Sequence, residues 1–263
     1  MSTGEFLRLT HEGAIARLRF TRPETLNALD LAGALALRDA ARAIAADNTV
    51  RAVLIEAEGR AFLAGGDVAA MTADPEWAPE VVAAIITPFH EALLTLRRQP
   101  APVVAAIHGA VAGGGFSLAL ACDIVIAADN TRLVYAYTKI GTTADGGATW
   151  FLPRVVGLRR ALEIALLSEP LDAAQALALG LVTQVVPQAD LSERALVVAQ
   201  RLAEGPTGAF AQVRRLMETA FDRPLSAHLE EEQAAFVAQA SGPDFHEGCC
   251  AFLEKRAPVF LGR

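Results

Sequence analysis

The chain has 263 residues and a mass of 27.7 kDa, which allows one large domain or one domain with a smaller appendage. Hydrophobic residues make up 53% of the chain and charged residues 20%, which excludes an intrinsically disordered chain. The net charge is −7, from 23 basic and 30 acidic residues, and this excludes the broad basic surface that nucleic-acid binding requires.

The N-terminal segment and the cysteines indicate a cytoplasmic protein. Residues 1–13 lack the basic, then apolar, then small-residue order of a signal peptide. Cys122, Cys249 and Cys250 form neither a disulfide framework nor a metal-binding pattern, as expected in a reducing compartment. One uncharged stretch, residues 103–122, is long enough to cross a bilayer, but its glycines favour a strand, a turn and a buried helix instead. We therefore expect no membrane partner.

The first two thirds of the chain alternate strand and helix patterns. Apolar residues alternate with polar ones over residues 14–20, which predicts a half-buried strand. Asp30 predicts the N-cap of a helix that runs to about Ala46. Further patterns follow: a buried strand over 50–56, a glycine-rich turn over 59–66, a helix over 79–98, a strand over 103–107, a helix over 114–121 and a strand over 123–127. This order favours a mixed α/β fold in which helices cover sheets.

Strand patterns stop after Pro187. Four helical stretches follow, separated by Gly-Pro or Arg-Pro pairs, at residues 189–204, 206–221, 225–240 and 243–255. We expect a boundary near residues 190–205, with a core at 1–200 and a helical region at 201–263. The helical region is too small to be a convincing independent domain, and we expect it to pack against another subunit.

Two glycine-rich segments, residues 59–67 and 109–116, follow predicted strands and are candidates for chemistry. Glycine lets backbone N–H groups approach a ligand, and the second segment opens a helix, whose N-terminus favours negative charge. Two such N–H donors aimed at one carbonyl oxygen would make an oxyanion hole. On pattern alone, the glycines fit a role in close helix packing equally well.

These segments resemble the enoyl-CoA hydratase/isomerase (crotonase) superfamily, and the likeness covers essentially the whole chain. The matching segments fall in the family's order, at residues 22–29, 61–68, 102–109, 113–123, 139–157, 180–187 and 252–260. The resemblance implies a crotonase-like spiral of ββα units followed by a C-terminal helical trimerisation region, which commonly builds hexamers. It also implies an acyl-CoA thioester as substrate, with no cofactor besides the coenzyme A of the substrate and no metal.

The resemblance also implies roles for particular residues. The oxyanion donors are the backbone N–H groups of Gly66 and Gly114. Four residues match positions that line the adenine and pantetheine of coenzyme A, namely Leu26, Ala64, Asp67 and Val68. Arg22 is a candidate phosphate contact, and the alternative is a solvated arginine at a strand end.

The acid–base positions depart from the hydratase members of this family. Those members carry one glutamate two positions after the glycine triplet and a second one four positions before the glycine matched by Gly141. Here Ser117 and Tyr137 stand at these positions, and we expect these two residues, together with His90, to bind the substrate. Hydration of a conjugated double bond needs a group that activates water and an acid that protonates the α-carbon, so ordinary hydration is expected to be impaired.

Asp145 provides a carboxylate at a position other than those of the two hydratase glutamates. Its position matches the single aspartate of the ring-1,2-epoxyphenylacetyl-CoA isomerase branch, which acts on phenylacetate-derived thioesters and shifts enoyl double bonds. One carboxylate suffices for a 1,3-proton shift. The neighbours Tyr135, Tyr137 and Trp150 predict an apolar site that raises the pKa of Asp145. The alternative is a turn residue that caps the amides of residues 148 and 149.

His90 is a further candidate. Phe89 and His90 match an aromatic–histidine pair in 4-chlorobenzoyl-CoA dehalogenase, in which the aspartate matched by Asp145 is the nucleophile and the histidine activates water. A structural histidine is the alternative. The leading hypothesis is an acyl-CoA isomerase with Asp145 as proton shuttle. An enoyl-CoA hydratase that uses Asp145 and water, and a non-catalytic acyl-CoA-binding paralogue, are the competing ones.

Overall fold

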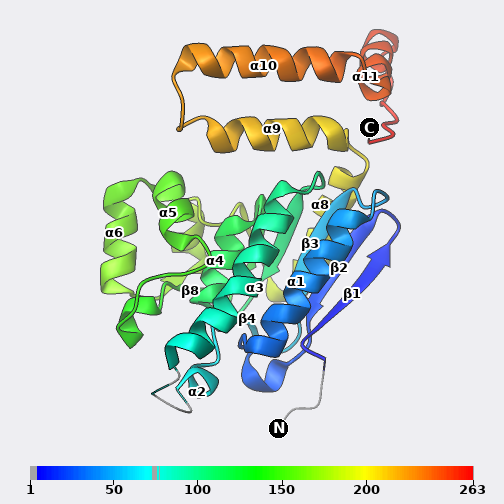
Figure 1. The fold of residues 1–263 in the computed structure, drawn as a ribbon. Coiled ribbons are helices and arrows are strands. Elements are labelled where there is room, and N and C mark those ends of the chain that lie inside the picture. Colours follow the sequence, from blue (N-terminus) through cyan, green and yellow to red (C-terminus); the bar gives the residue numbers. More distant parts are fainter. Residues whose placement is uncertain (1–4, 73–75, 77, 263) are drawn as a thin grey trace.

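The computed structural model describes residues 5–72, 76 and 78–262, so residues 1–4, with which the N-terminal segment begins, lie outside this description. The strands are β1 (Leu7–Glu12), β2 (Ile15–Phe20), β3 (Ala52–Ala57), β4 (Ala61–Leu63), β5 (Val103–Ile107), β6 (Ala110–Ala112), β7 (Ile124–Ala128), β8 (Arg132–Val134), β9 (Leu171–Asp172) and β10 (Gln184–Val186) (Figure 1). The α-helices are α1 (Leu31–Ala46), α2 (Val68–Met71), α3 (Ala78–Arg98), α4 (Gly114–Ala121), α5 (Ala148–Val156), α6 (Leu158–Leu167), α7 (Ala173–Ala178), α8 (Leu191–Ala203), α9 (Thr207–Thr219), α10 (Leu225–Ala240) and α11 (Pro243–Glu254). Three 3₁₀ helices are η1 (Pro23–Thr25), η2 (Tyr137–Ile140) and η3 (Gln188–Asp190).

The strands form two sheets. The larger sheet has the order β1-β2-β3-β5-β7-β10, in which β1 is antiparallel to β2 and the other neighbours are parallel. The smaller sheet has the order β4-β6-β8-β9, in which β9 is antiparallel to β8. A strand of the larger sheet is followed by one of the smaller sheet in the pairs β3–β4, β5–β6 and β7–β8, and a helix follows the first two pairs directly. This repeat confirms the expected α/β spiral of ββα units.

The long predicted elements are confirmed, and several short strands were not predicted. Asp30 caps α1 as expected, because its side chain accepts a hydrogen bond from the amide of Gly33 at 2.7 Å. The glycine-rich turns contain the three-residue strands β4 and β6, which are too short to show a periodicity. The strand β1 was also not predicted, although its polar and apolar residues alternate.

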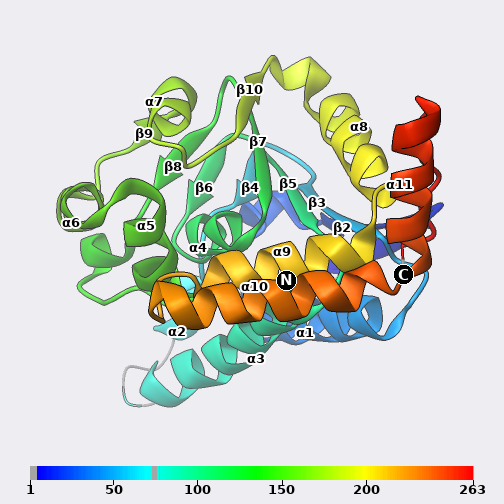
Figure 2. The same ribbon diagram turned by 90° about the horizontal axis from the view of Figure 1, so that it is seen from above.

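Helices bury both faces of the larger sheet. Along β5, Val103, Ala105 and Ile107 face the main core under α1 and α3, while Val104 and Ala106 face a second core under α8. Figure 2 shows α8 on the side of the sheet opposite to α1 and α3. Because both faces are buried, the central strands are continuously apolar, which is typical of parallel sheets.

The uncharged stretch over residues 103–122 folds as β5, β6 and α4 and therefore forms no single spanning helix. Among the described residues, α3 alone is long and apolar enough to cross a membrane by length and composition. Its apolar face is used inside the fold, where Ile85, Phe89, Leu93 and Leu96 are buried.

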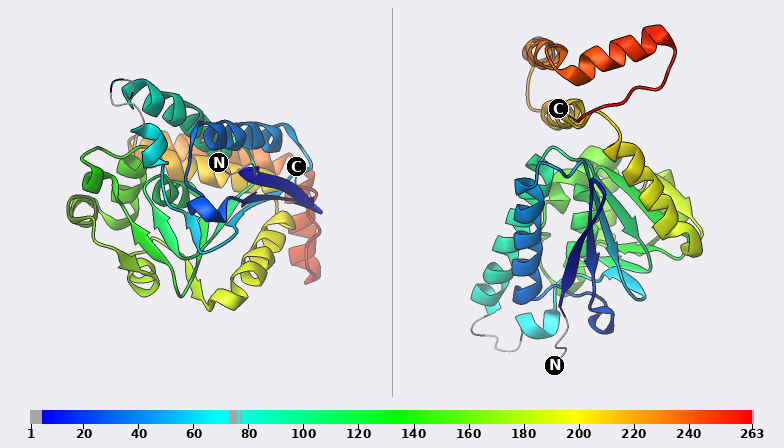
Figure 3. Two further views of the ribbon diagram at one scale, coloured as in Figure 1. Left: turned by 90° about the horizontal axis from the view of Figure 1, so that it is seen from below. Right: turned by 90° about the vertical axis from the view of Figure 1, so that its right-hand side faces the viewer.

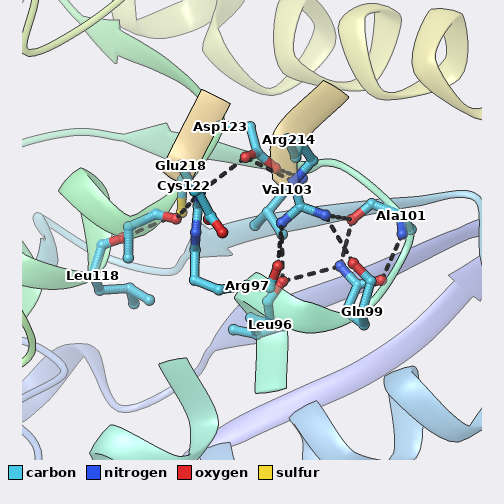
Figure 4. A network of polar contacts seen from close by, with 11 residues as sticks. Leu96, Arg97, Gln99, Ala101, Val103, Leu118, Cys122, Asp123, Arg214 and Glu218 are labelled. Atoms are coloured by element: carbon cyan, nitrogen blue, oxygen red, sulfur yellow. Dashed lines mark hydrogen bonds and ion pairs between the residues drawn. The ribbon is translucent and has the colours of Figure 1, made fainter. Parts of the chain in front are cut away.

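The helices α9, α10 and α11 form a layer that stands off the core (Figure 3). Arg214 on α9 ties this layer to the C-terminal end of α3. Its guanidinium group donates hydrogen bonds to four carbonyl oxygens at the end of α3 and in the following turn, those of Leu96, Arg97, Gln99 and Ala101 (Figure 4). Arg214 also forms an ion pair with Asp123, and Asp123 forms a second ion pair with Arg97. These contacts satisfy carbonyl groups that a helix end leaves without partners.

Candidate active site

Gly66 lies in the turn after β4, where the backbone orients its amide. The amide of Leu29 donates to the carbonyl of Gly65 at 2.8 Å, and the amide of Asp67 donates to the carbonyl of Leu29 at 3.0 Å. Neighbouring residues of an extended segment direct their N–H groups to opposite sides, so the N–H of Gly66 points away from Leu29. Among the described residues, this N–H donates to no other group.

Gly114 is the first residue of α4, so its N–H has no partner within the helix. The preceding residue, Gly113, has a φ of +51° and a ψ of −118°, a conformation that glycine adopts without a steric cost. The N-terminus of α4 adds a partial positive charge at this point. The amide of Gly114 can therefore act as a donor to a ligand.

The two turns lie side by side. The strands β4 and β6 are parallel neighbours, so the segments that follow them meet at one edge of the smaller sheet. A methyl group built on Gly113 would lie 3.5 Å from Cα of Gly65. The structure thus brings the neighbourhoods of Gly66 and Gly114 together, as two donors to one oxygen atom require.

Gly114 and Gly115 differ in whether the packing around them leaves room for a side chain. A β-carbon at Gly115 would lie 2.0 Å from the carbonyl oxygen of Leu63, so packing requires glycine there. A β-carbon at Gly114 would have as its nearest neighbours ring carbons of Phe89 at 3.7 Å, which is ordinary van der Waals contact. Close packing therefore explains Gly115 and leaves Gly114 unexplained.

Asp145 lies in the turn between η2 and α5, beside the glycine turns. A methyl group on the next residue, Gly146, would lie 2.7 Å from the ring of Phe89, and Phe89 also borders Gly114. Burial raises the pKa of Asp145 as expected, while the hydrogen bond from Tyr137 opposes this rise. The carboxylate caps no helix, because the N-cap of α5 is Gly147 and makes no side-chain cap.

Ser117 and Tyr137 both point at Asp145. The Tyr137 hydroxyl lies 2.5 Å from Oδ1 of Asp145. The Ser117 hydroxyl donates to the main-chain carbonyl of Asp145 at 2.9 Å and lies 2.8 Å from the Tyr137 hydroxyl. Both side chains are buried, and burial together with the negative charge of Asp145 raises the pKa of Tyr137. The sequence analysis identified these two positions but not their common partner.

His90 lies on α3 at the other side of the same turn. Its Nε2 accepts a hydrogen bond from the amide of Gly146 at 2.9 Å. An accepting Nε2 carries no proton in this geometry, so the proton of the neutral ring is assigned to Nδ1. His90 therefore holds the turn that carries Asp145. Phe89 is a site residue whose role the sequence did not predict, because its contacts with Gly114 and Gly146 join distant segments.

The residues matched to coenzyme A positions lie near the first turn. The carbonyl of Leu26 accepts a hydrogen bond from the amide of Ala64 at 3.1 Å, which places these two residues side by side. Asp67 caps α2 by accepting from the amide of Ala70, and Val68 is exposed. Their roles toward coenzyme A stay predictions.

Arg22 is neither solvated nor free. Two of its guanidinium nitrogens donate to the two carboxylate oxygens of Asp30 at 2.7 and 2.8 Å, and its guanidinium carbon lies 4.6 Å from the centroid of the Phe6 ring. This ion pair raises the pKa of Arg22 and lowers that of Asp30. Arg22 thus stabilises the start of α1, and a phosphate contact stays a prediction.

The comparisons with known proteins agree with this geometry. The family described as enoyl-CoA hydratase/isomerase matches residues 10–263. The chain belongs to the enoyl-CoA hydratase/isomerase family. It is therefore an acyl-CoA enzyme of the crotonase superfamily. Among the described residues, no group of three or more His, Cys, Asp or Glu could hold a metal ion.

Relatives within the family carry different activities in their names. The 1,2-epoxyphenylacetyl-CoA isomerase of Escherichia coli K12 is 35% identical, over 98% of this chain and 99% of its own. The 4-chlorobenzoyl coenzyme A dehalogenase-2 of an Arthrobacter species is 31% identical, over 95% of this chain and 91% of its own. The crystal structure of an enoyl-CoA hydratase from Polaromonas sp. JS666 superimposes with a TM-score of 0.92 at 37% identity, covering 97% of this chain and 99% of that one. The expected likeness to the isomerase branch is thus confirmed.

Proposed function

We propose that the protein isomerises an enoyl-CoA or a phenylacetate-derived CoA thioester by a proton shift that Asp145 carries. The observation that supports this proposal is the position of Asp145 beside the adjacent turns of Gly66 and Gly114. The two positions at which hydratase members carry glutamates hold Ser117 and Tyr137, whose hydroxyl groups are bonded to Asp145. A relative at 35% identity carries the name of such an isomerase.

The reaction needs one base and one place for negative charge. The Asp145 carboxylate takes a proton from the carbon next to the double bond, so that a C–H bond breaks and an O–H bond forms. The electron pair moves through the conjugated system to the thioester oxygen, where the N–H groups of Gly66 and Gly114 hold the charge. The same carboxylic acid then returns the proton to the far carbon and becomes a carboxylate again. Because burial raises the pKa of Asp145, the group is a stronger base than an exposed aspartate.

A substrate panel with product identification tests this function. The purified protein is incubated with 3-enoyl-CoA, 2-enoyl-CoA and 4-chlorobenzoyl-CoA, and the products are separated by chromatography. We expect double-bond migration, with a loss of about 10² to 10⁴ in kcat for Asp145→Asn. Asp39→Asn is the matched control, since Asp39 is an exposed residue of α1 and should keep full activity. Full isomerase activity of Asp145→Asn would refute the mechanism.

The same panel distinguishes the competing functions. Rapid addition of water to a 2-enoyl-CoA would show a hydratase that uses Asp145 alone. Tight binding of the thioesters without turnover would show a non-catalytic binder. Release of chloride would show a dehalogenase, but the engagement of Nε2 of His90 by the Gly146 amide opposes a role of this nitrogen in activating water.

We also propose that the C-terminal helices mediate a homotrimer or a hexamer. These helices and the turn between α9 and α10 expose large apolar side chains to solvent, namely Met217, Phe221, Leu225, Phe236, Val237, Phe252 and Leu253. An apolar surface of this kind is typical of an interface between subunits. Sedimentation velocity measures the assembly, and a monomer at micromolar concentration would contradict the proposal. A cytoplasmic location and a reaction without a separate cofactor stay predictions.

A further inference from the structure

We propose that Tyr137 and Ser117 are positioning residues that hold Asp145 by Oδ1 and leave Oδ2 as the oxygen that carries the proton. This inference rests on the proposed function of Asp145 and names the device that orients it. The two hydroxyl groups stand where hydratase members have their carboxylates. In this chain the two hydroxyl groups form hydrogen bonds with Asp145 and position its carboxylate, instead of acting on the substrate.

The number of hydroxyl protons fixes the direction of the hydrogen bonds. An ionised carboxylate has no proton to give, so the Tyr137 hydroxyl donates to Oδ1 across 2.5 Å. The single Ser117 hydrogen is then shared, as a three-centre hydrogen bond, between the Asp145 carbonyl at 2.9 Å and the Tyr137 oxygen at 2.8 Å. A hydroxyl that accepts such a bond is a stronger donor in turn. Ser117 therefore supports the bond from Tyr137 to Asp145.

The surroundings hold this arrangement rigid. Ser117 is fully buried on α4, and Tyr137 is 7% exposed on η2. The ring of Tyr137 packs edge-on against the ring of Tyr135, with centroids 5.2 Å apart. On the far side of the turn, the amide of Gly146 is bound to His90. Asp145 is thus held through its side chain, through its own carbonyl and through the next residue.

The second carboxylate oxygen is left for the substrate. Among the described residues, no other residue donates a hydrogen bond to Oδ2 of Asp145, and the remaining donor to this carboxylate is the backbone N–H of Asp145 itself. When Oδ2 takes a proton, Oδ1 keeps a lone pair that can accept from the Tyr137 hydroxyl. The hydrogen bond from Tyr137 is therefore present in both protonation states of Asp145. Because burial keeps Tyr137 protonated, it does not compete for the proton in transit.

The geometry has a measurable consequence for the pKa of Asp145. Burial raises this pKa, and the hydrogen bond from Tyr137 is the largest effect that opposes the rise. His90 on α3 is the other titratable side chain that acts on Asp145 among the described residues, and it would lower the pKa only as an imidazolium, a form that the hydrogen bond from the Gly146 amide to Nε2 opposes. Removal of the Tyr137 hydroxyl should therefore raise the pKa of Asp145, while the contact between His90 and Gly146 is left in place.

The test is a ¹³C NMR titration of protein labelled at the aspartate carboxyl carbon. The Asp145 resonance is the one that disappears in Asp145→Asn. We expect Tyr137→Phe to raise the midpoint by about one to two pH units, since a hydrogen bond to a charged group is worth about 1.5 to 3 kcal/mol. The matched control is Tyr135→Phe, which removes from the adjacent buried ring a hydroxyl that is bonded to the backbone of Ala144 and not to the carboxylate, and it should leave the midpoint in place.

Two further variants make the result decisive. Ser117→Ala should raise the midpoint in the same direction by a smaller amount, and it decides the question if Tyr137→Phe does not fold. Combining Tyr137→Phe with His90→Gln should preserve the shift, which separates it from titration of the imidazole. An unchanged midpoint in Tyr137→Phe, or in Ser117→Ala alone where only that variant folds, would overturn the inference.

Activity measurements separate this inference from the proposed function. In an active enzyme, the acid limb of kcat/KM should move to higher pH in Tyr137→Phe, and kcat should fall about tenfold with KM little changed. The titration itself needs no turnover. A protein without isomerase activity would refute the proposed function, and a Tyr137→Phe variant with an unmoved midpoint would refute the positioning role alone.

Discussion

The amide of Gly146 and Nε2 of His90 are joined by a hydrogen bond of 2.9 Å that connects α3 to the turn of Asp145. The two residues are 56 positions apart in the chain. The side chain of His90 thus accepts a hydrogen bond from the backbone of the turn. This bond fixes the position of His90 relative to Asp145, the residue with which it would pair in a dehalogenase. This arrangement gives His90 a structural role that can be tested separately from chemistry.

Replacing His90 by alanine should lower kcat about tenfold, because the Gly146 amide loses its acceptor and an unsatisfied amide costs about 1 to 3 kcal/mol. Steady-state kinetics on the isomerised substrate measures the effect. His90→Gln is the matched control, since its amide oxygen can replace Nε2 as the acceptor and should restore most of the activity. Equal impairment of both variants would show that the imidazole itself takes part in the reaction.

Replacing Gly114 by proline should lower kcat by about 10² to 10³ without unfolding the protein. Proline removes the N–H that we assign to the oxyanion hole, and it is tolerated at the first position of a helix. Gly114→Ala keeps the N–H and adds a methyl group at ordinary contact distance from Phe89, so its activity should stay within a few-fold of the wild type. Circular dichroism checks the fold. If proline and alanine had the same effect, the amide of Gly114 would not be a donor.

Asp145→Asn should unfold at a higher temperature than the wild type at pH 7. Burial raises the pKa of Asp145 in the folded state, so the unfolded state releases the proton first as the pH rises. The wild type consequently loses stability as the pH rises from the unfolded pKa through the folded one, and asparagine does not ionise. Thermal unfolding followed from pH 4 to pH 8 should show a difference that shrinks at the acid end. A difference independent of pH would contradict the raised pKa.

Replacing Arg214 by alanine should reduce the free energy of unfolding by about 1 to 3 kcal/mol, since the carbonyl groups at the end of α3 lose a charged donor while Asp123 keeps its ion pair with Arg97. Urea denaturation measures the loss. The adjacent Arg215 pairs with Glu231 at the surface, so Arg215→Ala should cost at most about 1 kcal/mol. Similar losses in the two variants would show that the contacts of Arg214 contribute little.

The family and the chemical inventory of the site could be predicted from the sequence. The motifs around Gly66, Gly114 and Asp145 are local runs of residues, so they are visible without knowing how the chain folds. Long periodic segments such as α1 and α3 were predicted for the same reason. The strands β4 and β6 were not, because three residues are too few to define a period.

The partners of the site residues could not be predicted in this way. The sequence shows Ser117 and Tyr137 as replacements for glutamates, and the fold shows that both bind Asp145, which lies 28 and 8 positions away. It shows Arg22 as a candidate ligand of phosphate, and the fold places this side chain on Asp30. A hydrogen bond depends on the direction and distance of two particular atoms, which a residue pattern does not contain.

The sequence by itself thus determined which chemical groups this protein has and which family they belong to. The tertiary structure decided which of these groups meet, from the adjacent turns of Gly66 and Gly114 to the two hydroxyl groups on Asp145. The physical reason is that burial and hydrogen bonding, which set the pKa and orientation of Asp145, arise between segments that only the folded chain brings into contact.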